Sequence, residues 1–156
     1  MAQKATVYRA QLSISDLDRN YYADHSLTLA RHPSESEGRL MARLFAYALF
    51  AAPDLSFGRG ISTDDEPDLW RRDPTGNILH WIEVGLPDER RLRRATGRSE
   101  RVSLVAYGAR AFVLWHARQR DELERLGLLD IRLLEDAQFE TLEGFARRTM
   151  SLTCTI

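Results

Sequence analysis

The chain has 156 residues, of which 44% are hydrophobic and 29% charged, and its formal net charge is −1. These values are typical of one globular domain over residues 1–156. There is no signal-peptide pattern and no long apolar run, and the one cysteine, Cys154, excludes an intrachain disulfide and a Cys-rich metal cluster. We therefore expect a cytoplasmic protein without a membrane segment.

The N-terminal segment predicts an antiparallel hairpin. Apolar and polar residues alternate over residues 5–14, as in a half-buried strand. Turn-forming residues follow at 15–20, and a second short strand is expected at 25–31.

A helix is predicted after residue 33. Ser34 and Glu37 have the Ser-x-x-Glu spacing of a capping box. Apolar residues then recur at helical spacing from Leu40 to Ala48, and Pro53 ends the pattern. A short strand is expected near residues 55–62.

Strands and helices alternate through the rest of the chain. We expect strands at 78–86, 101–108, 128–135 and 149–156, and helices at 87–97, 109–127 and 136–148, the first starting at Pro87 or Asp88 with Gly97 just past its end. The pattern predicts an α+β fold, with a mixed sheet flanked by helices and the hairpin at its N-terminus. Because the sequence stops within a strand-like segment, we expect the native chain to continue beyond Ile156.

The segment "ISTDDEPDLW" (61–70) holds four carboxylates, and "WIEVG" places Glu83 in an apolar strand. If one strand ends in "EPDLW" and the turn "DPTGN" leads into the next, Glu83 returns close to Asp68. Such a pair suits Mg²⁺ or Mn²⁺. A buried glutamate needs a partner, which can be an arginine, a metal ion or a proton. We expect Asp64 and Asp65 to be solvated turn residues.

Six arginines lie between residues 90 and 101. Arginine binds phosphate groups well, and a helix N-terminus nearby adds favourable partial charge. The alternative is a solvated helix face whose arginines pair with Glu89 and Glu100. The four histidines have no metal-binding spacing, and a capping or turn role is expected for His32.

The motifs "LTLARHPSE", "FGRGISTDDEPDLW", "WIEVGLPDERRLRRA" and "RTMSLTCTI" resemble those of the YaeQ family of bacterial proteins over essentially the whole chain. That resemblance implies a PD-(D/E)XK nuclease-like fold with a restriction-endonuclease-like core. Pro67-Asp68 then matches the "PD" element, and Glu83-Val84-Gly85 matches "(D/E)XK" with glycine in place of lysine. Glu35 or Glu37 would complete the site, and Glu35 is preferred because the capping box accounts for Glu37.

The resemblance implies two functions. The first is a nuclease that binds Mg²⁺ or Mn²⁺ through Asp68 and Glu83, with Glu35 assisting and Arg90 and Arg94 positioning the phosphate. The second is a non-catalytic module that binds nucleic acid or protein, with nucleic acid contacted through Arg90, Arg91, Arg93 and Arg94. The missing lysine favours the second, since arginine stays protonated and cannot act as a base. A third alternative is a structural ion-pair network without a ligand.

Overall fold

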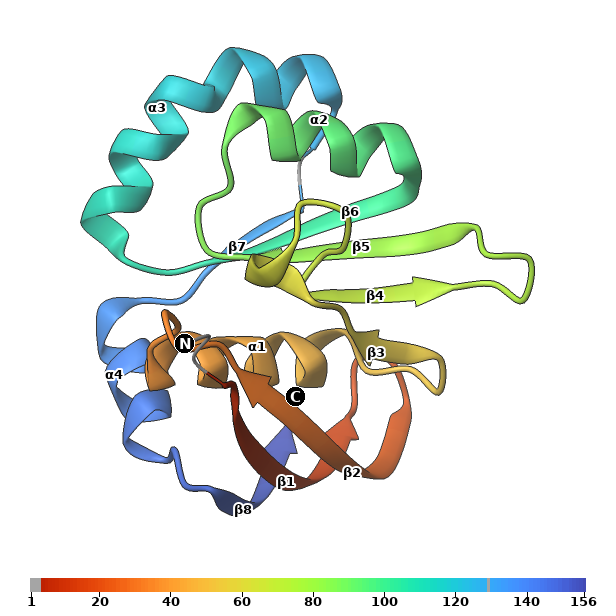
Figure 1. Ribbon diagram of the computed structural model, residues 1–156, viewed down its shortest axis with the longest axis vertical. Helices are drawn as coiled ribbons and strands as arrows, with labels where there is room; N and C mark the ends of the chain where they lie inside the picture. Colours follow the sequence, from red (N-terminus) through yellow and green to blue (C-terminus); the bar gives the residue numbers. More distant parts are fainter. Residues whose placement is uncertain (1–3, 129) are drawn as a thin grey trace.

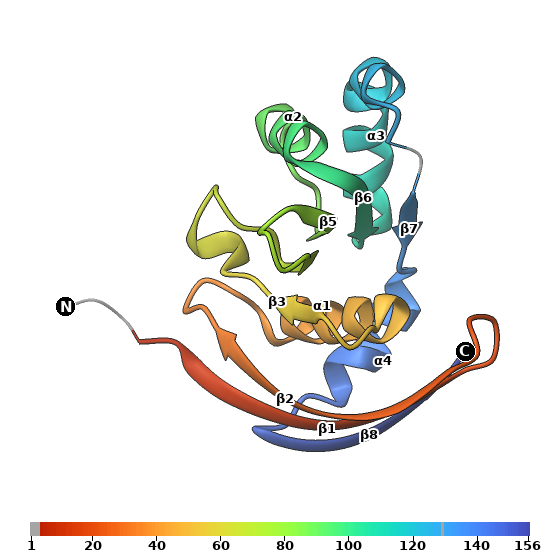
Figure 2. The same ribbon diagram turned by 90° about the vertical axis from the view of Figure 1, so that its right-hand side faces the viewer.

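The computed structural model describes residues 4–128 and 130–156. Two β-sheets lie on opposite sides of helix α1 (Glu37–Phe50), so the helix is the middle layer of the molecule (Figure 2). Both sheets contain parallel and antiparallel strand pairs, which confirms the predicted α+β class. No helix in the described residues is long and apolar enough to cross a membrane.

The three-stranded sheet has the order β2-β1-β8, formed by β2 (Tyr21–Arg31), β1 (Thr6–Asp16) and β8 (Thr149–Thr155). The predicted hairpin is confirmed, because β1 and β2 pair antiparallel along their whole length. The alternation places Tyr8, Ala10, Leu12 and Ile14 on the buried face. β8 pairs in parallel with β1, so the last strand joins the first hairpin and not the strands that precede it.

The five-stranded sheet has the order β3-β4-β5-β6-β7. Its strands are β3 (Leu55–Phe57), β4 (Leu69–Arg72), β5 (Ile78–Val84), β6 (Ser99–Ala106) and β7 (Ile131–Leu133). β3, β4 and β5 run antiparallel, and β5, β6 and β7 run parallel. The β4–β5 turn forms as predicted, with Asp73 accepting backbone hydrogen bonds from Thr75 and Asn77.

Helices α2 (Glu89–Arg98) and α3 (Ala109–Leu126) cover the outer face of the five-stranded sheet, and α4 (Asp136–Gly144) packs against α1 (Figure 1). Gly97 lies inside α2, so the predicted end of that helix is wrong; Asp88 is its N-cap. Gly127 ends α3 with a φ of 71°, a conformation that suits glycine. One apolar cluster surrounds α1 and a second lies under α2 and α3.

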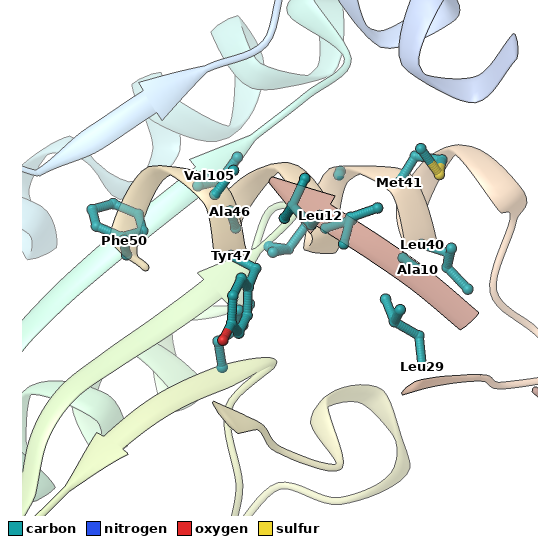
Figure 3. Close-up of a cluster of buried hydrophobic side chains, with 14 of the residues drawn as sticks. Ala10, Leu12, Leu29, Leu40, Met41, Ala46, Tyr47, Phe50 and Val105 are labelled. Carbon is teal, nitrogen blue, oxygen red and sulfur yellow. The ribbon is translucent and has the colours of Figure 1, made fainter. Parts of the chain in front are cut away.

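The cluster around α1 draws on both sheets. Figure 3 shows Ala46 of α1 near Val105 of β6, and Leu40 near Ala10 and Leu29 of the hairpin. α1 is therefore buried on several sides, and it carries the polar residues of the candidate site between the two sheets.

The start of α1 differs from the prediction. Its N-cap is Ser36, whose hydroxyl accepts a hydrogen bond from the Arg39 amide at 3.1 Å. The Ser34–Glu37 capping box is wrong, because Ser34 Oγ lies 2.7 Å from Nδ1 of His32 and Glu37 accepts from the Tyr8 hydroxyl. The His32–Pro33–Ser34 turn thus ends before the helix starts. The N-cap of α1 lies two residues later than the sequence pattern implied.

Candidate acidic site

Asp68 lies directly before β4, and not inside a strand that ends at residue 70 as expected. Its carboxylate is 1% exposed. Oδ2 accepts from the Val84 amide at 2.8 Å, and Oδ1 accepts from Nη2 of Arg39 at 2.9 Å. Leu69 pairs with Ile82 in antiparallel register, which brings the preceding Asp68 beside Glu83 as the sequence predicted.

Two glycines allow the segment after β3 to close over Asp68. A Cβ on Gly60 would lie 2.4 Å from Oδ1 of Asp68, and one on Gly58 would lie 2.2 Å from the Pro67 carbonyl oxygen. The φ of Gly60 is also positive, at 52°. Any larger residue would push this segment away. The motif "FGRG" was part of the family resemblance, but its role as a cover was missed in the sequence.

Glu35 lies just before α1 and is held by two arginines of that helix. Arg43 binds both of its carboxylate oxygens, through Nε and Nη2 at 2.8 Å each. Nη1 of Arg39 donates to the same carboxylate at 2.9 Å. Glu35, Arg39 and Arg43 recur every four residues, which is the spacing of neighbours on one helix face. That signal was present in "ESEGRLMAR", and sequence reasoning missed both arginines.

Glu83 has a separate set of partners on the α2 side. Its Oε1 accepts from the indole N–H of Trp81 at 2.8 Å and from Nε of Arg91 at 2.6 Å. Burial raises the pKa of Glu83 to about 7, and the neighbouring Asp68 carboxylate adds to the rise, while Arg91 and Trp81 oppose it. The two carboxylates are therefore close enough to repel each other, although they share no hydrogen-bond donor.

The arginines of α2 bind the acidic segment of this same chain. Arg91 also donates to the carbonyl oxygens of Gly60, Thr63 and Glu66. Arg94 donates to the Asp64 carbonyl oxygen at 2.7 Å and lies 3.5 Å from the Asp65 carboxylate. Asp64 and Asp65 remain largely exposed, as the sequence predicted, but their carboxylates also form ion pairs with Arg91 and Arg94.

Two further arginines of the predicted cluster, Arg93 and Arg90, behave differently. Arg93 pairs with Glu89, as the solvated-face interpretation predicted, and with Glu122. Arg90 is exposed, and neither it nor Glu100 forms an ion pair within the described residues. Arg90 is thus the member of the cluster with its charge left available to a ligand.

A cavity of about 290 Å³ lies at the N-terminal end of α1. Glu35 and Asp68 line it together with Arg39, Arg43 and the segment from Phe57 to Ser62. Glu83 is not among its lining residues, and neither is the exposed Lys4. The structure therefore brings Asp68 next to Glu83 along the sheet and next to Glu35 across the cavity, but it does not gather all three carboxylates in one cavity.

As arranged, these groups fit a guanidinium better than a divalent metal ion. Arg39 bridges Glu35 and Asp68 and also donates to the Val84 carbonyl oxygen at 3.0 Å. The described residues contain no group of three or more His, Cys, Asp or Glu side chains placed to hold a metal. A hard cation would need the carboxylate oxygens that Arg39 now occupies.

Gly85 stands where the resemblance places a lysine, and its backbone is specialised for glycine. Its φ is 107°, although a Cβ there would meet no atom within 4 Å. A side chain at this position would therefore meet no clash at its Cβ, but it would strain the backbone.

Sequence and structure comparisons agree on the relatives of this chain. A family model described as YaeQ protein matches residues 1–156. The chain is 45% identical to an uncharacterised YaeQ protein of Salmonella typhi and 44% identical to that of Escherichia coli K12, in each case over all of this chain and 86% of the relative.

Two crystal structures of YaeQ proteins have the same fold. That from Xanthomonas axonopodis pv. citri is 49% identical with a TM-score of 0.89, over 97% of this chain and 86% of the other. That from Pseudomonas syringae is 38% identical with a TM-score of 0.90, over 97% and 84%. With its whole length matched by the family model and its fold shared with these structures, the chain belongs to the YaeQ family.

Proposed function

We propose that this protein binds nucleic acid on a nuclease-like scaffold and does not cleave it, because arginine takes the place of the metal ion at its acidic site. The observation that carries the proposal is the Arg39 guanidinium, which bridges the buried carboxylates of Glu35 and Asp68. A buried ion pair of this kind is costly to break, since removing either partner leaves a charge without compensation.

The order of the elements supports the nuclease-like scaffold that the sequence resemblance implies. Asp68 directly precedes β4, Glu83 lies near the end of β5, and Glu35 lies two residues before α1, next to its N-cap. These are the positions that the "PD" and "(D/E)XK" elements and the additional glutamate would take on a mixed sheet flanked by helices. What departs from the resemblance is Gly85, together with the arginines that bind each acid.

Nucleic acid is supported by the contacts of the acidic segment with α2. Carboxylate and carbonyl oxygens of residues 60–66 lie on Arg91, Arg94 and Arg98, and phosphate oxygens would make the same type of contact. Arg90 lies one helical turn before Arg94, and Arg59, which lines the cavity, is 74% exposed. Arg59, whose Nε donates to Glu66 at 2.9 Å, and Arg90 therefore present exposed guanidinium groups at the cavity and on α2.

Binding can be measured by fluorescence anisotropy with labelled single- and double-stranded DNA and RNA at two salt concentrations. We expect the Arg59→Gln/Arg90→Gln double variant to bind more weakly and to show a salt dependence reduced by about one unit per lost phosphate contact. The matched control is Arg118→Gln/Arg120→Gln, which removes two exposed charges from α3. Equal losses in both variants, or no binding by wild type, would contradict the proposal.

The metal can be tested separately by calorimetric titration with Mn²⁺. We expect no saturable binding to wild type in the millimolar range, and a gain of binding in Arg39→Ala, because Glu35 and Asp68 then lack their counter-ion. Circular dichroism of the variant, with and without Mn²⁺, checks that it is folded.

The second candidate is metal-dependent cleavage of phosphodiester bonds, with Mg²⁺ or Mn²⁺ held by Asp68 and Glu83. It is favoured by the adjacency of these carboxylates and by the raised pKa of Glu83, since opposed carboxylates gain from a shared cation. Residues Asp68 and Glu83 would hold the ion, which would activate a water molecule for attack on phosphorus. Micromolar Mn²⁺ binding to wild type that is lost in Asp68→Asn would establish this candidate in place of the first.

A further inference from the structure

A second polar cavity, of about 240 Å³, lies at the other end of α1. Residues from both sheets and from the C-terminal end of α1 line it. Its charged and titratable lining residues are Asp16, Asp18, Arg19, Arg71, His80, Arg101 and Arg132. Four arginines therefore face two aspartates, and the cavity lies outside the acidic site described above.

The strand register places three of these side chains in one row. Arg71 of β4 pairs with His80 of β5, and His80 pairs with Arg101 of β6. Residues paired in this way project from the same face of the sheet. Arg101 and Arg132 both lie over the ring of Phe50, with guanidinium carbons 5.7 and 4.9 Å from its centroid. The positive charges thus converge on His80 because of the fold.

Aspartates partly compensate these arginines from outside the cavity lining. Asp54 binds Arg71 through both carboxylate oxygens, at 2.6 and 3.2 Å. Asp130 binds Arg101 at 3.0 Å and Arg132 at 3.3 Å. Arg71, Arg101 and Arg132 therefore share two carboxylates, and Nη1 of each has no hydrogen-bond partner among the described residues.

His80 is held in one orientation by a relay of side chains. Burial would raise the pKa of Asp130, but hydrogen bonds from Ser103 and the arginines outweigh it and lower that pKa, so Asp130 is ionised. The Ser103 hydroxyl donates to Asp130, and Ser103 Oγ therefore accepts from Nε2–H of His80 at 2.8 Å. The serine lies between the histidine and the aspartate and is fully buried, which is not the order of a hydrolytic triad.

This relay leaves Nδ1 of His80 as an acceptor. The side chain is 3% exposed, and no described residue donates to Nδ1. Burial, followed by the charge of Arg101, lowers the pKa of His80 to about 4, so the ring is neutral at physiological pH. A ring nitrogen with a free lone pair and the Nη1 groups of three arginines thus belong to residues that line the same cavity.

We propose that this cavity binds a phosphate group, with arginines 71, 101 and 132 donating to its anionic oxygens and Nδ1 of His80 accepting from its P–OH. The volume is below the range of drug-sized ligand pockets, so inorganic phosphate or a small phosphate monoester fits better than a nucleotide. This site is independent of the proposed nucleic-acid surface.

The test is a titration of the ¹⁵N-labelled full chain with inorganic phosphate at constant ionic strength, followed by histidine ring NMR signals. We expect Nδ1 of His80 to shift with saturation. The internal control is His25, whose two ring nitrogens are bound to the hydroxyls of Tyr21 and Tyr47 and whose signals should not move. Because this measurement uses wild type, a folding defect cannot obscure it.

Three further arms define the ligand and the site. Sulfate, which has no O–H at neutral pH, should bind at least tenfold more weakly than phosphate, and methyl phosphate at pH 5 should bind as phosphate does, since it keeps one P–OH there. Arg71→Gln and Arg132→Gln should each weaken phosphate binding at least tenfold, whereas Arg59→Gln/Arg90→Gln should not change it. Equal affinity for sulfate, or an unmoved His80 signal, would overturn the proposal.

Discussion

At the residue scale, the carboxylates of the acidic segment and its neighbours have distinct environments. Asp68 is bound by Arg39 and a backbone amide, whereas Glu83 has Arg91 and Trp81. Sequence reasoning identified Glu83 as a buried acid that needs a partner and placed Asp68 beside it. It could not identify those partners, because Arg39 and Arg91 come from helices 29 residues before Asp68 and 8 residues after Glu83. An arginine count does not show which guanidinium reaches which carboxylate.

The raised pKa of Glu83 predicts a pH dependence of stability. Its folded-state pKa of about 7 lies above the ordinary value of 4.5, so its contribution to stability is fully present below pH 4.5 and is lost as the pH rises through 7. Between pH 4.5 and 8, wild type should therefore lose about 3 kcal/mol relative to Glu83→Gln. Urea unfolding of both proteins across this range gives the difference in their free energies of unfolding. The contributions of groups that titrate alike in both proteins cancel in that difference. A difference that stays constant with pH would refute the assignment.

Gly85 and Gly97 form a matched pair for testing backbone strain. At neither position would an added Cβ meet an atom within 4 Å, but only Gly85 has a positive φ. Gly85→Ala should destabilise the protein by about 1–2 kcal/mol. Gly97→Ala, inside α2, should stabilise it by about 0.5–1 kcal/mol. Thermal and urea unfolding measure both, and similar effects at the two positions would show that φ is not the cause.

At the scale of elements, the hairpin and most helices could be predicted because their apolar residues follow one period without interruption. The alternation in residues 8–14 is an example, and β1 forms there. The start of α1 and the end of α2 were predicted wrongly, because a short local motif is compatible with more than one helix boundary. Ser34 and Ser36 both precede a helical pattern, and burial of Glu35 between two arginines selects Ser36 as the cap.

The true N-cap of α1 can be tested with the two serines. Ser36→Ala should lower the free energy of unfolding by about 1 kcal/mol, because the Arg39 amide loses its acceptor. Ser34→Ala is the control and should change stability little, since Ser34 is exposed and its hydroxyl bonds only to the His32 ring. A larger effect at Ser34 would restore the capping box that the sequence suggested.

At the scale of the whole molecule, α1 connects the two sheets into one cooperative structure. Its buried side chains contact β1 on one side and β5 and β6 on the other, within a single apolar cluster. The division into two sheets could not be predicted, because strand patterns do not specify partners. β8 has the same alternation whether it joins β7 or β1. The helix before it, α4, packs against α1, and β8 then pairs with β1.

This arrangement predicts that both sheets unfold together. Trp70, Trp81 and Trp115 report on the five-stranded sheet and its helices, while the single cysteine, Cys154, reports on β8. In urea, tryptophan fluorescence and thiol reactivity should change at the same midpoint. Leu40→Ala should move both midpoints together, with a loss of about 2–5 kcal/mol. Separate midpoints would show that the sheets are independent units.

The parallel pairing of β1 with β8 also has a consequence for synthesis of the chain. Arg9 lies opposite Thr149, so the central strand of the three-stranded sheet lacks one neighbour until residues 149–155 have left the ribosome. During that time, one edge of β1 presents unpaired amide and carbonyl groups, which is the feature that promotes strand exchange between molecules. Closing so long a loop is also slow. The N-terminal hairpin is therefore the part of a nascent chain that gains most from protection by a chaperone.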